Sequence, residues 1–299
     1  MRRMRTQPPD DGLPLLVASA DWSQERGRRR IAIARRRAGR YRIEALEIPP
    51  VGPALLDALL EGAGREQAVF GADFPMGVPR AWAVRAGISC FPAFLRDMDE
   101  EAFRRLTTPA ARAEEIELLR PFYPARPGGA RRRDLVRGLG LSSFDELLRE
   151  CDRRTRGCAP FWLVGANQVG KAGIAGWREL LRPALRSRLP VAIWPFATPR
   201  ITAGAARLLL VETYPAWYRR LWRRERGMAW MQRLRIGVVP SLDARVRAEL
   251  APAARRSDSG DALFGLLGMI AALCGLLPRE APQHADVCRI EGWVCGLAP

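Results

Sequence analysis

The chain has 299 residues, the length of one large domain or two ordinary ones, and its basic residues outnumber its acidic residues by 49 to 32. This surplus favours a polyanionic partner, nucleic acid first, although nearly all the basic residues are arginine, which a GC-rich coding bias would also produce. The single histidine, His284, argues against hydrolases with a histidine base and against histidine-clustered metal centres, and six scattered cysteines argue against a secreted disulfide scaffold. We therefore expect reduced thiols and a cytoplasmic protein.

The N-terminal end resembles a membrane-targeting signal without meeting its requirements. Arginines precede the apolar residues 13–20, but Asp10 and Asp11 interrupt the pattern and the apolar part is short for a signal peptide. Residues 262–277 carry no charge, yet a membrane-spanning helix needs about 20 residues. We expect residues 1–12 to be a flexible basic N-terminus, residues 262–277 to be a buried helix, and no part of the chain to enter a membrane.

The first quarter of the chain carries four strand patterns and one helix pattern. Residues 13–21 form an apolar run that ends in an acid, which is typical of a buried strand. Residues 30–37 and 41–48 alternate apolar with polar side chains and flank a tight turn, so they predict a β-hairpin. Residues 53–64 repeat leucine at helical spacing, and residues 67–73 predict a fourth strand that also ends in an acid.

The middle of the chain, from about residue 80 to 187, departs from this pattern. Short helical stretches at 100–106, 110–119 and 143–151 alternate with loops rich in proline, glycine and arginine, which indicates an insertion within a single domain spanning 13–299. After it, residues 191–196 and 207–212 predict strands, and residues 217–226 and 242–250 predict helices. Ser257 is placed to cap a long helix over 260–276, and a short tail, 289–295, follows.

Carboxylates stand at corresponding places in several of these elements. Asp21, Asp73 and Glu212 each end a strand, while Asp258 and Asp261 lie on one side of the start of the last long helix. The carboxyl ends of parallel strands meet at one edge of a sheet, where acids repel one another unless a cation lies between them. Hard oxygen donors without histidine or thiolate indicate Mg²⁺ or Mn²⁺, and two such ions can support phosphodiester cleavage. The alternative is that each acid only forms a turn or begins a helix.

The order of the predicted elements resembles the ribonuclease H-like fold. Its short motifs are similar to those of the family called domain of unknown function 429, whose members are described as predicted nucleases. The matching segments are Ala20-Asp21-Trp22, Asp73-Phe74-Pro75-Met76-Gly77, Glu212-Thr213-Tyr214-Pro215, Asp258-x-x-Asp261-Ala262-Leu263 and Glu291-Gly292-Trp293. The resemblance covers nearly the whole chain apart from the insertion. It implies an α/β fold with three antiparallel strands followed by parallel strands, and a metal-dependent acidic site formed by Asp21, Asp73, Glu212 and Asp261.

Two further features suggest contacts with phosphate. Residues 165–172 nearly match a P-loop around Lys171, the one lysine of the chain, but alanine replaces the magnesium-binding hydroxyl residue. Arginines form two rows on the helix that follows Glu212, where they would either clamp phosphates or form a solvated face; these are Arg219, Arg220, Arg223 and Arg224. Arginines 28–30 would extend the same surface.

The sequence therefore predicts a nuclease of ribonuclease H-like fold that uses Mg²⁺ or Mn²⁺ to hydrolyse phosphodiester bonds in nucleic acid. Asp21, Asp73, Glu212 and Asp261 are the expected catalytic residues and, with Asp258, the expected metal ligands. Two alternatives remain open. One is a non-catalytic, basic nucleic-acid-binding protein on the same scaffold, and the other is a nucleotide-binding protein that uses the loop of residues 165–171.

Overall fold

The computed structural model describes residues 12–50, 52–165, 169–198, 200–201, 206–224, 229–251 and 255–299, without the side chains of residues 224 and 229. The expected flexible N-terminus therefore lies almost wholly outside the described residues. Among these, the strands form a mixed seven-stranded sheet in the order β5-β6-β4-β1-β2-β3-β7. The strands are β1 (Leu16–Asp21), β2 (Arg30–Arg37), β3 (Arg40–Glu47), β4 (Ala68–Ala72), β5 (Val191–Ile193), β6 (Leu208–Glu212) and β7 (Gly237–Val238).

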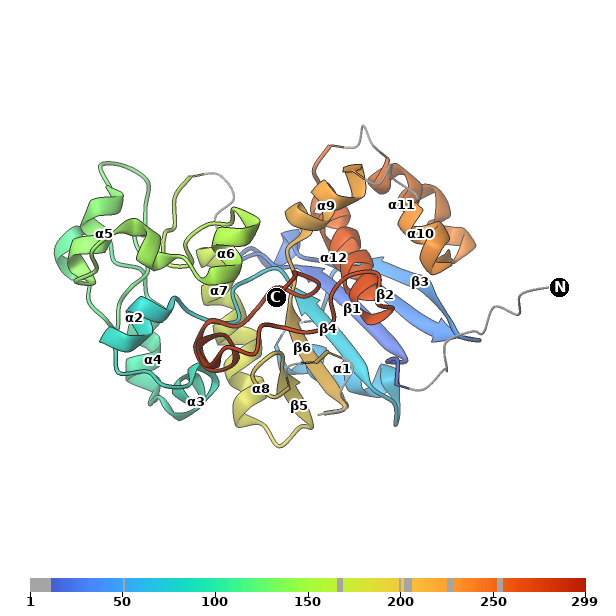
Figure 1. Ribbon diagram of the computed structural model, residues 1–299, viewed down its shortest axis with the longest axis horizontal. Helices are drawn as coiled ribbons and strands as arrows, with labels where there is room; N and C mark the ends of the chain where they lie inside the picture. Colours follow the sequence, from blue (N-terminus) through green and yellow to red (C-terminus); the bar gives the residue numbers. More distant parts are fainter. Residues whose placement is uncertain are drawn as a thin grey trace.

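Helices flank this sheet (Figure 1). The α-helices are α1 (Pro53–Ala63), α2 (Arg80–Arg85), α3 (Phe91–Asp97), α4 (Glu100–Leu106), α5 (Arg132–Gly138), α6 (Glu150–Thr155), α7 (Gly170–Gly176), α8 (Arg182–Arg186), α9 (Pro215–Arg224), α10 (Ala229–Leu234), α11 (Asp243–Leu250) and α12 (Asp258–Leu273). The 3-10 turns are η1 (Arg26–Arg28), η2 (Ala113–Glu115), η3 (Phe144–Leu147) and η5 (Pro240–Leu242), and the π-helical turns are η4 (Trp177–Leu181) and η6 (Val287–Glu291).

The sheet combines antiparallel and parallel pairs, as the sequence predicts. β1 pairs with β2 and β2 with β3 in antiparallel fashion, whereas β1, β4, β6 and β5 are parallel to one another in neighbouring pairs. The register places Ala20 beside Ala72 and Ala72 beside Glu212, so the central strands end at one edge of the sheet. Asp21, Asp73 and Glu212 are thereby brought to this edge. The structure is an α/β fold with flanking helices.

Alternation along the central strands divides the core into two layers. Ala18, Phe70 and Leu210 face one side of the sheet, where they pack with the leucines of α1 and with η4. Val17 and Val69, one residue earlier on their strands, face the other side and pack with α12. α12 is buried almost throughout its length and lies across β1 and β2 (Figure 1). The expected buried helix is confirmed, but it ends at Leu273 and not at residue 276 or 277, because the chain turns at Gly275, which has a positive φ. No described helix is long and apolar enough to cross a membrane.

Small residues allow α12 to lie close to the sheet. A Cβ atom at Gly71 of β4 would lie 2.3 Å from Sδ of Met269, and one at Gly265 of α12 would lie 2.2 Å from Oγ of Ser19. A Cβ atom at either position would force these side chains to move, so glycine allows the helix to pack at this distance from the strands. The helix begins as predicted, because Oγ of Ser257 accepts the N–H of Gly260 at 2.9 Å. The start of α12 lies near the ends of β1 and β4, where Asp258 and Asp261 line the same space as Asp21 and Asp73.

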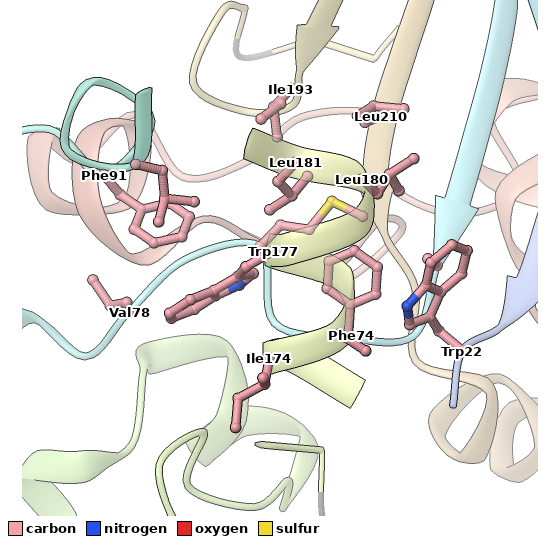
Figure 2. Packing of buried hydrophobic residues seen from close by; sticks show 14 of the residues in the cluster. Trp22, Phe74, Val78, Phe91, Ile174, Trp177, Leu180, Leu181, Ile193 and Leu210 are labelled. Atoms are coloured by element: carbon pink, nitrogen blue, oxygen red, sulfur yellow. The ribbon is translucent and has the colours of Figure 1, made fainter. Parts of the chain in front are cut away.

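Residues 80–187 form a lobe of short helices beside the sheet. The last helix of this lobe, α7–η4–α8, packs against the sheet (Figure 2). One end of its apolar surface contacts Phe91 of the lobe, and the other contacts Ile193 and Leu210 of the sheet; the helix contributes Ile174, Trp177, Leu180 and Leu181. The helix predicted at 110–119 is wrong, since only the turn η2 forms there, and the helix predicted at 143–151 is instead η3 followed by α6. Both segments are too short and too irregular in their apolar spacing for a stable helix of their own, so tertiary contacts decide their conformation.

Candidate functional site

A cavity of about 340 Å³ opens at the edge where β1 and β4 end. The starts of α7, α9 and α12 surround it. It is lined by Asp21, Trp22, Ser23, Arg28, Asp73, Val169, Ala172, Tyr214, Pro215, Ala216, Arg256, Ser257, Asp258 and Asp261. Four of the five acids that the sequence predicts as site residues therefore face one space.

Asp21 and Asp73 form a carboxyl pair on the floor of this cavity. Burial raises the pKa of Asp21 to about 10, and the charge of Asp73 and a hydrogen bond between the two carboxyls contribute to this rise. Burial also raises the pKa of Asp73 to about 6, against the opposing effect of the Trp22 N–H, which donates to Oδ1 of Asp73 at 2.6 Å. In the described part of the chain no arginine lies within ion-pair distance of either carboxyl, although the charge of Arg256 acts on both from further away. At neutral pH the pair therefore holds a proton in place of a second negative charge.

The two acids on α12 are in a different electrostatic environment. Oδ1 of Asp258 lies 3.5 Å from Nη2 of Arg28. Asp261 is buried and accepts from Nη2 of Arg219 at 2.8 Å and from Nε of Arg256 at 2.7 Å. The side chains of Arg28 and Arg256 are 63% and 56% exposed and line the cavity themselves. The rim thus presents two solvent-accessible guanidinium groups above an acidic floor.

Glu212 is at the same edge of the sheet but does not line this cavity. Its oxygens accept from Nη1 and Nη2 of Arg149 at 2.7 and 2.6 Å, and Oε2 also accepts the N–H of Met76 at 2.8 Å. It lines a second, water-sized cavity of about 20 Å³, which shares Asp73 and Tyr214 with the larger one. The expectation that Glu212 joins the other acids in one open site is therefore not met, because a buried arginine occupies its carboxylate.

Glu212 also belongs to a second group of possible metal ligands. Atoms of Cys151, Asp152 and Glu212 lie within 4.8 Å of one another and are buried. Arg149 already pairs with both carboxylates, and burial raises the pKa of the Cys151 thiol, which favours its protonated form. This cluster is a closed ion-pair network in the structure. All six cysteines are free, as the sequence predicts.

The predicted phosphate-binding residues are dispersed. Arg219 pairs with Asp261 and lies over the Phe264 ring, so it is not available as a phosphate clamp. Arg220 donates to the carbonyl of Thr155 at 2.7 Å, Arg223 is exposed, and the side chain of Arg224 lies outside the described residues. Arg219 and Arg220 therefore already have partners within the chain, and the phosphate contact of the row on α9 stays a prediction.

Lys171 lies in the first turn of α7, between Val169 and Ala172, which line the larger cavity, while Lys171 itself does not. A P-loop requires a strand before its loop. The preceding residues form only an isolated bridge at Trp162, and residues 166–168 of the loop lie outside the described residues. The context that a P-loop needs is thus not present in the described residues.

The sequence did not identify Arg256 or Arg149 as functional. Local patterns could not reveal the partner of Arg149, because Arg149 and Glu212 are 63 positions apart in the chain. The sequence marks Arg28 only as part of a basic run.

Comparisons of the chain with protein families, with curated proteins and with solved structures find no match.

Proposed function

We propose that the protein is a ribonuclease H-like, metal-dependent hydrolase of phosphodiester bonds in nucleic acid. The observation that carries this proposal is the pair formed by Asp21 and Asp73, two adjacent carboxyls that line a cavity and lack an arginine partner among the described residues. Such a pair is stabilised by a divalent cation, which removes the repulsion that contributes to the raised pKa of Asp21. The sheet order, with acids at the ends of β1 and β4, supports the fold assignment.

The donor set fits Mg²⁺ or Mn²⁺. Carboxylate oxygens are the ligands these ions prefer, and the described residues around the cavity offer no thiolate or imidazole. Asp21 and Asp73 would hold the ion, with Asp258 at the margin of the same space. When bound, the ion would supply Lewis-acid activation of water and of the phosphate.

The residues of the chain would contribute binding and orientation. Arg28 and Arg256 are the exposed cationic groups at the rim, and each would donate hydrogen bonds to non-bridging phosphate oxygens. Asp258 and Asp261 hold these arginines over the cavity in the absence of substrate. Ser257 caps α12 and so fixes the first turn of the helix, which carries both acids.

The test is a thermal scan and a cleavage assay in Mg²⁺, Mn²⁺ or chelator. Metal at a hundredfold excess over its Kd should stabilise the wild type by about 2.7 kcal/mol, which corresponds to a shift of a few degrees in Tm. The Asp21→Asn, Asp73→Asn double variant should lose both this shift and metal-dependent cleavage of a DNA and RNA panel. Asp57→Asn, at an exposed position of α1, is the matched control and should behave as the wild type. Equal shifts in the double variant and the control would refute the metal site.

A non-catalytic nucleic-acid-binding protein is the second candidate. It is favoured by the ion pairs that already neutralise Asp258 and Asp261, since these leave only two carboxyls of the described cavity without a cationic partner. On this alternative the wild type binds nucleic acid with chelator and with metal alike, and cleaves none of the panel.

A further inference from the structure

Arg149 is a fully engaged, buried guanidinium group. Its Nε and Nη2 donate to the two oxygens of Asp152 at 2.9 Å each, and Nη2 and Nη1 donate to the two oxygens of Glu212. Nη1 also donates to the carbonyl of Glu291 at 3.2 Å, so that every N–H of the guanidinium has an acceptor. The side chain is 1% exposed. Its orientation is therefore fixed by three segments: α6, the end of β6 and the C-terminal segment.

Glu212 connects Arg149 to the turn that follows β4, because its carboxylate accepts hydrogen bonds from both. Its Oε2 accepts the N–H of Met76, three residues after Asp73. From the other side, Nε1 of Trp177 donates to the carbonyl of Pro75 at 2.8 Å (Trp177 and Phe74 are seen in Figure 2). The same turn passes so close to the C-terminal segment that a Cβ at Gly77 would lie 2.0 Å from the carbonyl oxygen of Glu291. The turn that follows Asp73 is thus held by hydrogen bonds to Glu212 and Trp177 and by close packing against the C-terminal segment.

We propose that Arg149 is a positioning residue of the acidic site: by holding Glu212 it fixes the turn after β4, and so keeps Asp73 beside Asp21. On this inference Glu212 holds the turn after β4 in place and is not a metal ligand. This inference rests on the proposed function, because it assigns Arg149 a role in presenting Asp73 to a cation. It differs from the expectation that Glu212 binds the metal directly.

The energetics of the network support this assignment. A metal ion on Glu212 would have to displace two short hydrogen bonds from Arg149 and leave a guanidinium buried with fewer partners. Breaking a buried ion pair by removing one partner is strongly destabilising, since the remaining charge stays uncompensated in the interior. Asp21 and Asp73 present a smaller obstacle, because no described arginine lies within ion-pair distance of them and Arg256, whose charge acts on both, pairs with Asp261. A cation therefore binds at the aspartate pair with less rearrangement.

Mn²⁺ titration of purified full-length variants, followed by the electron paramagnetic resonance of the free ion, tests the inference. Arg149→Lys keeps the charge but supplies fewer donors, and Asp152→Asn loosens Arg149 from the side away from Glu212. Arg182→Lys is the matched control, because Arg182 is also a buried arginine that donates to carbonyls and to a glutamate, but within the lobe of residues 80–187. Circular dichroism sets a temperature at which each variant compared is folded.

We expect Arg149→Lys and Asp152→Asn to weaken Mn²⁺ binding by about 10-fold to 100-fold, the range typical of residues that orient metal ligands. Arg182→Lys should bind Mn²⁺ as the wild type does. Should Arg149→Lys not fold, Asp152→Asn alone decides. Tighter binding in these variants would overturn the inference, because it would mean that Arg149 withholds Glu212 from the metal. Binding equal to that of the control would overturn it as well. A wild type that binds no Mn²⁺ would refute the proposed function, and the role of Arg149 with it.

Discussion

Replacing Asp21 with asparagine should change how the stability of the metal-free protein depends on pH. In the folded protein the pKa of Asp21 is raised to about 10, far above its value of about 3.8 in an unfolded chain. A carboxyl whose pKa is raised on folding stabilises the fold below its unfolded pKa, and this stability is lost as the pH rises toward the folded pKa. The wild type should therefore become less stable from about pH 4 upward, whereas the asparagine of the variant has no proton to lose.

The size of the effect follows from the linkage between pKa and stability. Each pH unit within the window costs about 1.4 kcal/mol, so the limit between pH 5 and pH 8 is about 4 kcal/mol. Because the carboxyl faces a cavity that water enters, we expect about half of this limit, ~2 kcal/mol. The unfolding free energy of Asp21→Asn, measured relative to the wild type, should thus rise by this amount across the window.

Urea denaturation at pH 5, 6, 7 and 8 with chelator measures this difference directly. Asp57→Asn removes a carboxyl from an exposed position of α1 and should give a curve parallel to that of the wild type. If the curve of Asp21→Asn is also parallel to the wild type, Asp21 does not take up a proton on folding. The reasoning that links the carboxyl pair to a cation would then fail.

Three further outcomes follow from the same contacts. Arg28→Ala combined with Arg256→Ala should weaken nucleic-acid binding for all sequences and flatten the slope of log K against log salt by about 0.9 per lost duplex contact, measured by fluorescence anisotropy. Arg219→Ala should lower Tm and leave that slope unchanged, because Arg219 serves Asp261 and not a phosphate; a flattened slope would contradict this. Ser257→Ala should cost about 1 kcal/mol of unfolding free energy by removing the cap of α12, which urea denaturation would show.

Elements with strong local signals were predictable from the sequence. β1, β2, β4 and β6 have clear apolar or alternating patterns, and they form close to their expected limits. α12 also begins where its capping serine places it. From α2 to α6, by contrast, the helices have only six or seven residues, so that periodicity has too few turns to be recognised. The continuous α7–η4–α8 helix, Gly170 to Arg186, is long enough, but Gly173, Gly176 and Pro183 are poor helix formers and conceal it in the sequence.

The sequence predicts where the acids of the site lie, but it does not predict which side chains pair with them. The position of an acid at the end of a strand is a local property, which is why Asp21 and Asp73 could be expected at one edge of the sheet. Whether a carboxylate is open or occupied depends on side chains that folding brings from elsewhere. Glu212 shows this, since the arginine that occupies it immediately precedes α6 and no pattern around either residue indicates the pairing.

The contacts of Glu291 also set the order in which the molecule can be completed. Its carboxylate accepts the N–H of Arg80, 211 positions earlier, and the N–H of Glu150, 141 positions earlier, at the starts of α2 and α6. During synthesis both helix starts must therefore wait until residue 291 has emerged before they gain this acceptor. Arg149 waits for the same segment, because one of its acceptors is the Glu291 carbonyl. The strands β1, β2 and β4 precede residue 73, so they can begin to pair before the acidic edge has the contacts of Glu291 that complete it.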